Sequence, residues 1–223
     1  MSADLARQAL AATLDNGARS LGLSLSAAQC ALLLAHLDLV AQWSRTYNLT
    51  AVRDPEAMLG VHLLDSLAAS LPLRRVLGER GASVLDVGSG AGFPGIPLAI
   101  AQADLRVTCM DAVAKKASFV RHVVAELSLE GVNALHSRVE IARPQRWDAI
   151  VSRAFASLAD FIRLTRHLLA PGGVWMAMKG HVHHDELAAL PADIEVFHVE
   201  PLSVPTLDAT RCLVWMKLRQ AVA

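Results

Sequence analysis

A glycine-rich stretch at residues 84–97 constrains this chain more than any other segment. It opens with an apolar run that has the pattern of a short buried strand in a parallel sheet. Glycines follow at alternate positions, namely Gly88, Gly90 and Gly92. Glycine tolerates positive φ and lets a ligand approach the bare backbone. Pro94 and Pro97 suit the start of a helix, where a missing N–H costs least. The stretch therefore predicts a strand, a ligand-binding turn and a helix.

Two kinds of cofactor bind at such a turn, and the glycine spacing distinguishes them. The dinucleotide fingerprint G-x-G-x-x-G/A needs a small third residue, and that position holds Phe93. The chain instead has an acid, one residue and then G-x-G-x-G, which resembles the first motif of S-adenosylmethionine-dependent methyltransferases. Asp86 is expected to accept hydrogen bonds from the ammonium of that cofactor, directly or through water. An ordinary strand-to-helix turn is the alternative, and the acid with three alternating glycines argues against it.

Composition limits the fold and the partners. The chain has 223 residues, 53% of them hydrophobic, which suits one α/β domain with a small appendage. Its 21 basic residues balance 21 acidic ones, so any RNA site must be a local patch. Cys30, Cys109 and Cys212 form no C-x-x-C pair and are typical of buried thiols in a reducing compartment. No signal peptide or membrane-spanning run is evident, so we expect no membrane partner. We also expect a monomer, and the family resemblance described below implies a cytoplasmic location.

The first part of the chain, residues 3–70, is helical in pattern. One amphipathic helix is expected before Gly22, and Ser26 is placed to cap a second. The sequence Asp-Pro-Glu at 54–56 predicts the start of a third helix, because it supplies a capping acid and a proline at the first helical position. The expected buried stripe of that helix is Met58, Val61, Leu64 and Leu67.

The connection 71–82 contains Pro72, Gly78 and Gly81, and we place a domain boundary there. The chain is thereby divided into an N-terminal helical region, 1–75, packed on a methyltransferase domain, 76–223. Strands and helices alternate in the second part. Strands are expected at 84–87, 106–110, 132–136, 147–152, 174–178, 195–199 and 213–218, and helices at 94–102, 114–127, 158–169 and 186–190, with a turn at 171–173. This order predicts a mostly parallel seven-stranded sheet of the Rossmann-like type, closed by an antiparallel hairpin at one edge.

Ligands of open parallel sheets bind outside the carboxyl ends of the strands, and polar residues gather there. Asp111 ends the second strand about 20 residues after the glycine turn, where a ribose-binding acid belongs. Capping of the next helix is its alternative role. The segment Ser137–Glu140 follows the third strand and is expected near the adenine, unless Glu140 is a solvated loop charge. Arg153 ends the fourth strand, where a buried charge must be paired or used, and we expect it to serve the reaction more than the fold.

The same strand ends indicate what kind of atom is methylated. Enzymes that methylate amines commonly have Asn or Asp followed by two prolines after the fourth strand, and this chain lacks that motif. No cysteine occupies a strand end where it could act as a nucleophile. The acceptor should therefore already be nucleophilic, as guanine N7 is. Phe155 is a candidate surface for the acceptor base, with a place in the core as the equally weighted alternative.

Basic residues cluster in sequence near these strand ends. Lys115 and Lys116 follow the second strand, and Lys179 ends the fifth. An RNA-backbone patch and ordinary solvated charges are both compatible with this cluster. His181, His183 and His184 lie close together, but their spacing fits a metal site poorly, and we expect no metal.

Five segments together resemble the bacterial small-subunit ribosomal RNA guanine-N7 methyltransferases, the RsmG or GidB family. They are Tyr47–Thr50, His62–Leu67, Asp86–Pro97, Ser152-Arg153-Ala154-Phe155-Ala156 and Met178-Lys179-Gly180. The resemblance runs from about Asn48 to the C-terminus. It implies a class I methyltransferase domain that uses S-adenosyl-L-methionine, and 16S rRNA as substrate, within the small ribosomal subunit or an assembly intermediate.

The resemblance also implies roles for individual residues. Gly88 and Phe93 would line the cofactor pocket, with Gly90 in the same turn, Val139 and Glu140 would flank the adenine, and Arg153 would lie beside the cofactor. Two alternatives stay open at this point. One is a non-catalytic RNA-binding assembly factor that retains the fold, and the other is a nicotinamide-dependent oxidoreductase, against which Phe93 argues.

Overall fold

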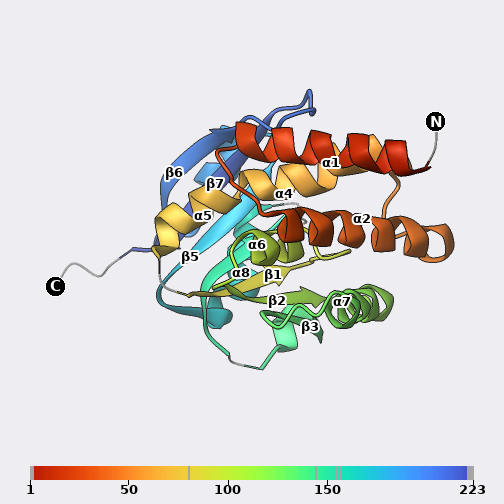
Figure 1. The fold of residues 1–223 in the computed structure, drawn as a ribbon. Helices are drawn as coiled ribbons and strands as arrows, with labels where there is room; N and C mark the ends of the chain where they lie inside the picture. The colour runs from red at the N-terminus through yellow and green to blue at the C-terminus, as the bar shows by residue number, and fades with distance from the viewer. Residues whose placement is uncertain (1–2, 80, 144, 154, 156, 220–223) are drawn as a thin grey trace.

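A seven-stranded sheet forms the centre of the molecule in the computed structural model (Figure 1), with the order β3-β2-β1-β4-β5-β7-β6. The structure describes residues 3–79, 81–143, 145–153, 155 and 157–219. The strands are β1 Ser83–Val87, β2 Arg106–Asp111, β3 Val132–His136, β4 Trp147–Ser152, β5 Leu169–Lys179, β6 Ile194–Leu202 and β7 Arg211–Leu218. β1 to β5 pair in parallel, whereas β7 runs antiparallel to both β5 and β6. The predicted Rossmann-like sheet with an antiparallel edge is confirmed.

Helices cover both faces of the sheet because neighbouring residues of each strand point to opposite sides. Val84 packs with one apolar cluster and Leu85 with the other. The first cluster joins the sheet to α1 Ala3–Ser20, α2 Ala27–Tyr47, α4 Asp65–Ala68, α5 Ser70–Leu77, α6 Gly95–Ala101 and α7 Ala114–Glu126. The second joins it to α8 Leu158–Thr165 and the short helices η2 Val139–Ile141, η3 Arg166–Leu168 and α9 His184–Ala188. The result is a three-layer α/β/α architecture.

The N-terminal helices begin where the sequence predicts. Ser26 caps α2, and its hydroxyl accepts a hydrogen bond from the Gln29 amide while the Gln29 side chain accepts one from the Ser26 amide. Asp54 caps the short helix α3 Pro55–Met58 through the Ala57 amide at 2.8 Å. The helix then continues as a π-helix, η1 Leu59–Leu64, before α4. The wider turn moves Val61 out of the expected stripe, so Val61 is half-buried while Met58, Leu64 and Leu67 are buried.

Two expected connections are regular structure instead. Residues 71–77 of the expected linker belong to α5, because Pro72 lies in the first turn of the helix, where a missing N–H is tolerated. The expected turn at 171–173 lies inside β5, where the pairing of β4 with β5 shifts register between Trp147 and Ala149. Likewise the helix expected at 158–169 gives way to η3 after Thr165. The division at residues 75 and 76 stays a prediction, and one continuous core cluster spans both sides of it.

Among the described residues, no helix combines the length and the apolarity needed to cross a bilayer.

Candidate active site

The glycine turn between β1 and α6 is held by hydrogen bonds from its own backbone. The amides of Gly88 and Ser89 donate to the Met110 carbonyl at 2.8 and 3.1 Å, and the Gly90 amide donates to Asp111 Oδ2 at 3.0 Å. Gly88, Gly90 and Gly92 all have positive φ, as the alternating pattern predicts. The turn is thus fastened to the carboxyl end of β2, and its peptide backbone forms the floor of two cavities.

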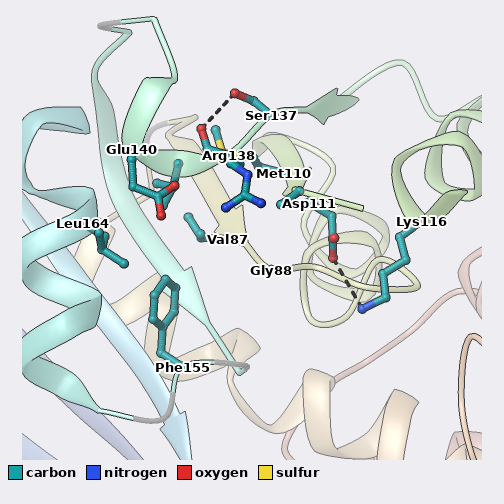
Figure 2. Close-up of a pocket in the computed structure, with 12 residues that line it drawn as sticks. Val87, Gly88, Met110, Asp111, Lys116, Ser137, Arg138, Glu140, Phe155 and Leu164 are labelled. Atoms are coloured by element: carbon teal, nitrogen blue, oxygen red, sulfur yellow. Dashed lines mark hydrogen bonds and ion pairs between the residues drawn. The ribbon is translucent and has the colours of Figure 1, made fainter. Parts of the chain in front are cut away.

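The first of these, the β2–β3 cavity, has a volume of about 320 Å³ and opens at the ends of β1, β2 and β3. Figure 2 shows its lining, which is apolar at the base and charged at the rim. The lining residues include Val87, Gly88, Met110, Asp111, Lys116, Ser137, Arg138, Val139, Glu140, Phe155 and Leu164. In Figure 2 the Arg138 guanidinium lies between the carboxylates of Glu140 and Asp111, and Lys116 approaches Asp111 to 3.9 Å. An apolar slot with a carboxylate at one end suits an adenosine group.

Asp111 caps the start of α7 and still has oxygen lone pairs free to bind a ribose hydroxyl. Its Oδ1 accepts the Val113 amide at 2.8 Å, which ties down the start of α7, and its Oδ2 accepts the Gly90 amide. Each carboxylate oxygen can accept a further hydrogen bond, as a ribose hydroxyl would require. Val139 is buried and Glu140 exposed, and both line the β2–β3 cavity as expected of residues that flank an adenine.

The second cavity, the turn cavity, lies on the other side of Gly88 and has a volume of about 220 Å³. It is lined by Leu49, Thr50, His62, Gly88, Ser89, Gly90, Ala91, Phe93 and Arg153. Phe93 is buried between two imidazoles, with ring centroids 4.7 Å from His36 and 4.8 Å from His62. The Arg153 guanidinium carbon lies 5.5 Å from the Phe93 ring centre, in cation–π contact. Because both cavities share Gly88, one elongated ligand can lie across the turn.

Both imidazoles of this stack are held in the neutral form. Burial lowers the pKa of His36 to about 4, and burial together with the Arg153 charge lowers the pKa of His62 to about 4. His36 Nε2 lies 2.8 Å from the Ala91 carbonyl, to which a neutral ring donates. His62 Nε2 lies 2.8 Å from Thr50 Oγ1, and its Nδ1 lies 3.5 Å from Arg153 Nη2. A neutral His62 that accepts from Arg153 at Nδ1 therefore donates to Thr50 at Nε2.

Arg153 is paired as well as placed beside the turn cavity. Its Nη1 donates to Asp65 Oδ2 and to the Val61 carbonyl, both at 2.9 Å. Asp65 is 2% exposed and accepts at Oδ1 from Arg211 Nε at 2.9 Å. Arg153 therefore has a structural role, because it neutralises a buried carboxylate, and the expectation that it serves the reaction more than the fold stays a prediction.

Asp86 lies beneath the turn rather than in either cavity. Its side chain is fully buried, and Oδ2 accepts the Gly95 amide at 2.8 Å. Oδ1 has no hydrogen-bond partner among the described residues. Burial raises the pKa of Asp86 to about 7. This position fastens α6 to β1, and it gives no support to the expected direct contact with the ammonium of the cofactor.

Other predicted residues are dispersed. Lys179 pairs with Glu186 at 2.7 Å, Lys116 is drawn to Asp111, and Lys115 is exposed. Phe155 lines the β2–β3 cavity and also packs on Phe161, with ring centroids 5.1 Å apart.

Ala154 and Ala156 lie outside the described residues. Within the described residues no group of three or more His, Cys, Asp or Glu could hold a metal ion, and His181 packs edge-on against His183.

Sequence reasoning did not assign a site role to Thr50, His62, Asp65 or His36. The first three belong to segments that carried the family resemblance, which was a usable signal. His36 lies in the middle of α2, where nothing local distinguishes it from a solvated helix residue.

The fold is shared with solved methyltransferases. The 1,6-didemethyltoxoflavin-N1-methyltransferase of Burkholderia thailandensis, solved with S-adenosylhomocysteine, aligns with a TM-score of 0.57 and 15% identity, covering 88% of this chain and 92% of that one. A SAM-dependent methyltransferase from Aquifex aeolicus aligns with a TM-score of 0.54 and 19% identity, covering 73% and 93%. This chain therefore has the fold of the S-adenosylmethionine-dependent methyltransferases.

Sequence comparison gives the family. The family described as rRNA small subunit methyltransferase G matches residues 29–214. The protein named Ribosomal RNA small subunit methyltransferase G from Methylibium petroleiphilum is 58% identical over 209 residues, which cover 94% of this chain and 95% of that protein. The protein of the same name from Leptothrix cholodnii is 55% identical over 211 residues, covering 95% and 97%. This chain belongs to the rRNA small subunit methyltransferase G family, and its cofactor is S-adenosyl-L-methionine.

The two cavities fit that cofactor. Asp111 and the apolar wall of the β2–β3 cavity would hold the adenosine. The cofactor would extend over Gly88, which has no side chain in the way, and its methionine end would lie in the turn cavity. A Cβ at Gly90 would meet no atom within 4 Å, so the space above the turn is open for a ligand.

Proposed function

We propose that this enzyme transfers the methyl group of S-adenosyl-L-methionine to N7 of a guanine in 16S rRNA, within the small ribosomal subunit or an assembly intermediate. We further propose that it works as a monomer in the cytoplasm. The observation that carries the acceptor assignment is the chemistry of the turn cavity. It offers hydrogen-bond donors beside the methionine end of the cofactor site, and no nucleophilic thiol or anionic base lines it among the described residues.

No cysteine of this chain is suited to attack a pyrimidine ring. Cys109 lies under the glycine turn, Cys212 lies in β7, and Cys30 lies in α2. Burial raises the pKa of each thiol, and for Cys109 the rise is large. Because the thiolate is the nucleophile, a raised pKa makes each cysteine less reactive. The acceptor must bring its own lone pair, and guanine N7 does so without a proton to lose.

Thr50 and Arg153 supply the groups that distinguish guanine. Guanine presents two neighbouring acceptors, O6 and N7, whereas adenine presents a donor in place of O6. Thr50 Oγ1 accepts the Val52 amide at 3.2 Å and lies 2.8 Å from His62 Nε2. With both lone pairs occupied, the Thr50 hydroxyl hydrogen points elsewhere, and in this proposal it or the Arg153 guanidinium donates to O6.

The proposed chemistry requires positioning rather than proton transfer. S-adenosyl-L-methionine supplies a methyl group already activated by a sulfonium. The residues of this chain then need to hold the acceptor in line, exclude water and offer fixed dipoles. Because partial burial and the Arg153 charge keep His62 neutral down to a pH of about 4, the chemical step should depend little on pH between mild acidity and neutrality.

The test is transfer of a labelled methyl group to small subunits from a strain that lacks this enzyme. N7-methylguanine is detected by borohydride reduction followed by aniline cleavage of the RNA strand. Cleavage at a single guanine supports the proposal. A label that resists this treatment, or that appears on ribose or an exocyclic amine, contradicts it. The same assay on naked 16S rRNA decides whether the subunit is required.

A further inference from the structure

An aromatic surface, unused by the site described above, joins the C-terminal end of α2 to the middle of α7. It consists of Trp43, Tyr47, Phe119 and His122, and we call it the aromatic ledge. The Trp43 ring lies 5.2 Å from Tyr47, 5.3 Å from Phe119 and 5.3 Å from His122, measured between centroids. Phe119 is fully buried, whereas Trp43 and His122 are half-buried and Tyr47 is 43% exposed. The ledge thus has a fixed inner side and an open outer side.

The ledge lies next to the proposed acceptor position. Tyr47 is the last residue of α2, and Leu49 and Thr50, just beyond it, line the turn cavity. Figure 1 shows α2 and α7 at the same side of the sheet, and α7 begins just after Asp111 of the β2–β3 cavity. A strand of RNA whose guanine enters the turn cavity could therefore extend over this surface.

A continuous row of rings connects the ledge to the turn cavity. It runs from Trp43 through Phe119, His36 and Phe93 to His62. Centroid separations along the row lie between 4.7 and 6.4 Å. Contacts of this kind are preferred aromatic geometries and resist displacement. A base on the ledge would consequently keep a fixed position relative to the acceptor.

The two segments that carry the ledge are rich in basic residues, and the acidic residues Asp54, Asp111 and Glu126 lie just beyond their ends. Residues 40–53 and 112–125 contain no Asp or Glu, although the whole chain has as many acidic as basic residues. The basic side chains of these two segments are Arg45, Arg53, Lys115, Lys116 and Arg121. Lys115 is exposed and precedes Phe119 and His122 by one and two turns of α7, so it shares their side of the helix. Exposed aromatic faces with basic residues around them are the combination that binds single-stranded nucleic acid.

We propose that the aromatic ledge stacks an unpaired base of the substrate RNA next to the target guanine, while Lys115 contacts its phosphate. This proposal rests on the proposed function, since it assumes an RNA strand in the turn cavity. It adds a second binding site for the substrate, outside the cavity in which the methyl group is transferred.

Trp43 provides a natural probe of the ledge. The chain has four tryptophans, and Trp147, Trp175 and Trp215 are each 2% exposed or less. Quenching of tryptophan fluorescence by acrylamide therefore reports mainly on Trp43. Unmethylated small subunits, or a 16S rRNA fragment that serves as substrate, should protect this quenchable component on binding. Cofactor alone should leave it unchanged.

Variants of Tyr47 separate stacking from folding. For Tyr47→Leu we expect KM for small subunits to rise roughly fivefold or more, because a lost stacked base weakens binding by at least that factor. The kcat and the Kd for cofactor should stay the same. Tyr47→Phe keeps the ring and should restore the original KM. Lys115→Gln should reduce the slope of log K against log salt concentration by about one, the value for one phosphate contact. Arg19→Gln, at the far end of α1, should leave this slope unchanged.

The proposal is overturned if Trp43 stays quenchable in the RNA complex and KM is unchanged in Tyr47→Leu, while the enzyme still methylates N7. Failure of N7 methylation would instead remove the proposed function. Ultraviolet crosslinking in the small-subunit complex decides the partner, because a crosslink from the 43–47 segment to RNA supports the proposal and one to a ribosomal protein contradicts it. If Tyr47→Leu does not fold, the quenching and crosslinking of the unaltered enzyme still decide the question.

Discussion

We expect Arg153 to contribute both to the reaction and to the stability of the protein, through one guanidinium. Its Nη1 bonds to Asp65, a carboxylate that is 2% exposed and otherwise held by Arg211. We expect Arg153→Ala to reduce methyl transfer at least roughly tenfold and to lower the free energy of unfolding by about 2 kcal/mol, the scale of a lost charged hydrogen bond. Steady-state kinetics and urea unfolding measure the two effects.

A double-mutant cycle separates these two effects. In an Asp65→Asn background Arg153→Ala leaves no buried carboxylate short of a partner, so this substitution should cost less stability there while transfer stays impaired. An unchanged free energy of unfolding in Arg153→Ala would show that the ion pair contributes nothing. Normal turnover in the same variant would contradict a role of Arg153 in the reaction.

In the glycine turn and the helix after it, different glycines serve cofactor binding and core packing. Gly90 has φ +58° and open space where a side chain would point, whereas a Cβ at Gly95 would lie 2.7 Å from Cys109 Sγ and 2.9 Å from Asp86 Oδ2. Gly90→Ala should cost about 1 kcal/mol of stability through its left-handed backbone, and it should weaken cofactor binding because Gly90 lines the turn cavity.

Gly95→Ala should show the opposite pattern. The new methyl group overpacks the contact of α6 with β1 and β2, for which a loss of about 1–3 kcal/mol is typical. Calorimetric titration with S-adenosylmethionine and thermal unfolding of both variants check the pair. Equal losses of stability, with cofactor affinity unchanged in Gly90→Ala, would contradict this division of roles.

The sequence predicts the central elements well because their signals are local. β3 and β4 begin and end at the predicted residues, since each is a short run followed directly by polar residues. The π-helix η1 was not predictable in this way, because its extra residue per turn has no local signature. By widening the helix it brings Val61, His62 and Asp65 to Arg153, which lies about 90 residues further along the chain.

The same distinction explains which parts of the site could be predicted. Gly88, Asp111 and Val139 follow from the rule that ligands bind at the carboxyl ends of strands, and all three line the β2–β3 cavity. The contacts of His36 with Phe93 and of Asp65 with Arg211 join segments far apart in the chain. Nothing in a single sequence specifies such pairs, because they depend on how the N-terminal helices pack across the sheet.

At the scale of the whole molecule, three ionisable groups with large pKa shifts lie around one turn, and their shifts oppose one another. The pKa values of His36 and His62 are lowered to about 4, mainly by burial, so the unfolded chain binds two more protons than the folded one between pH 4.5 and 6, roughly. Burial raises the pKa of Asp86 to about 7, so the folded chain holds one extra proton over the same interval. Taken together, the unfolded chain binds about one more proton than the folded chain in this interval.

Stability should therefore rise with pH across this interval by about 1.4 kcal/mol per unit, the slope for one net proton. Asp86→Asn removes the opposing proton, so the slope should become steeper, to about 2.7 kcal/mol per unit. In His36→Gln the unfolded chain binds one proton fewer. The extra proton on His62 in the unfolded chain then balances the extra proton on Asp86 in the folded chain, so stability should hardly change with pH. Urea unfolding of the three proteins between pH 4.5 and 6, roughly, measures these slopes. Identical slopes in all three would mean that these groups titrate alike in the folded and unfolded chains, and that the turn is not assembled from neutral histidines and a protonated acid.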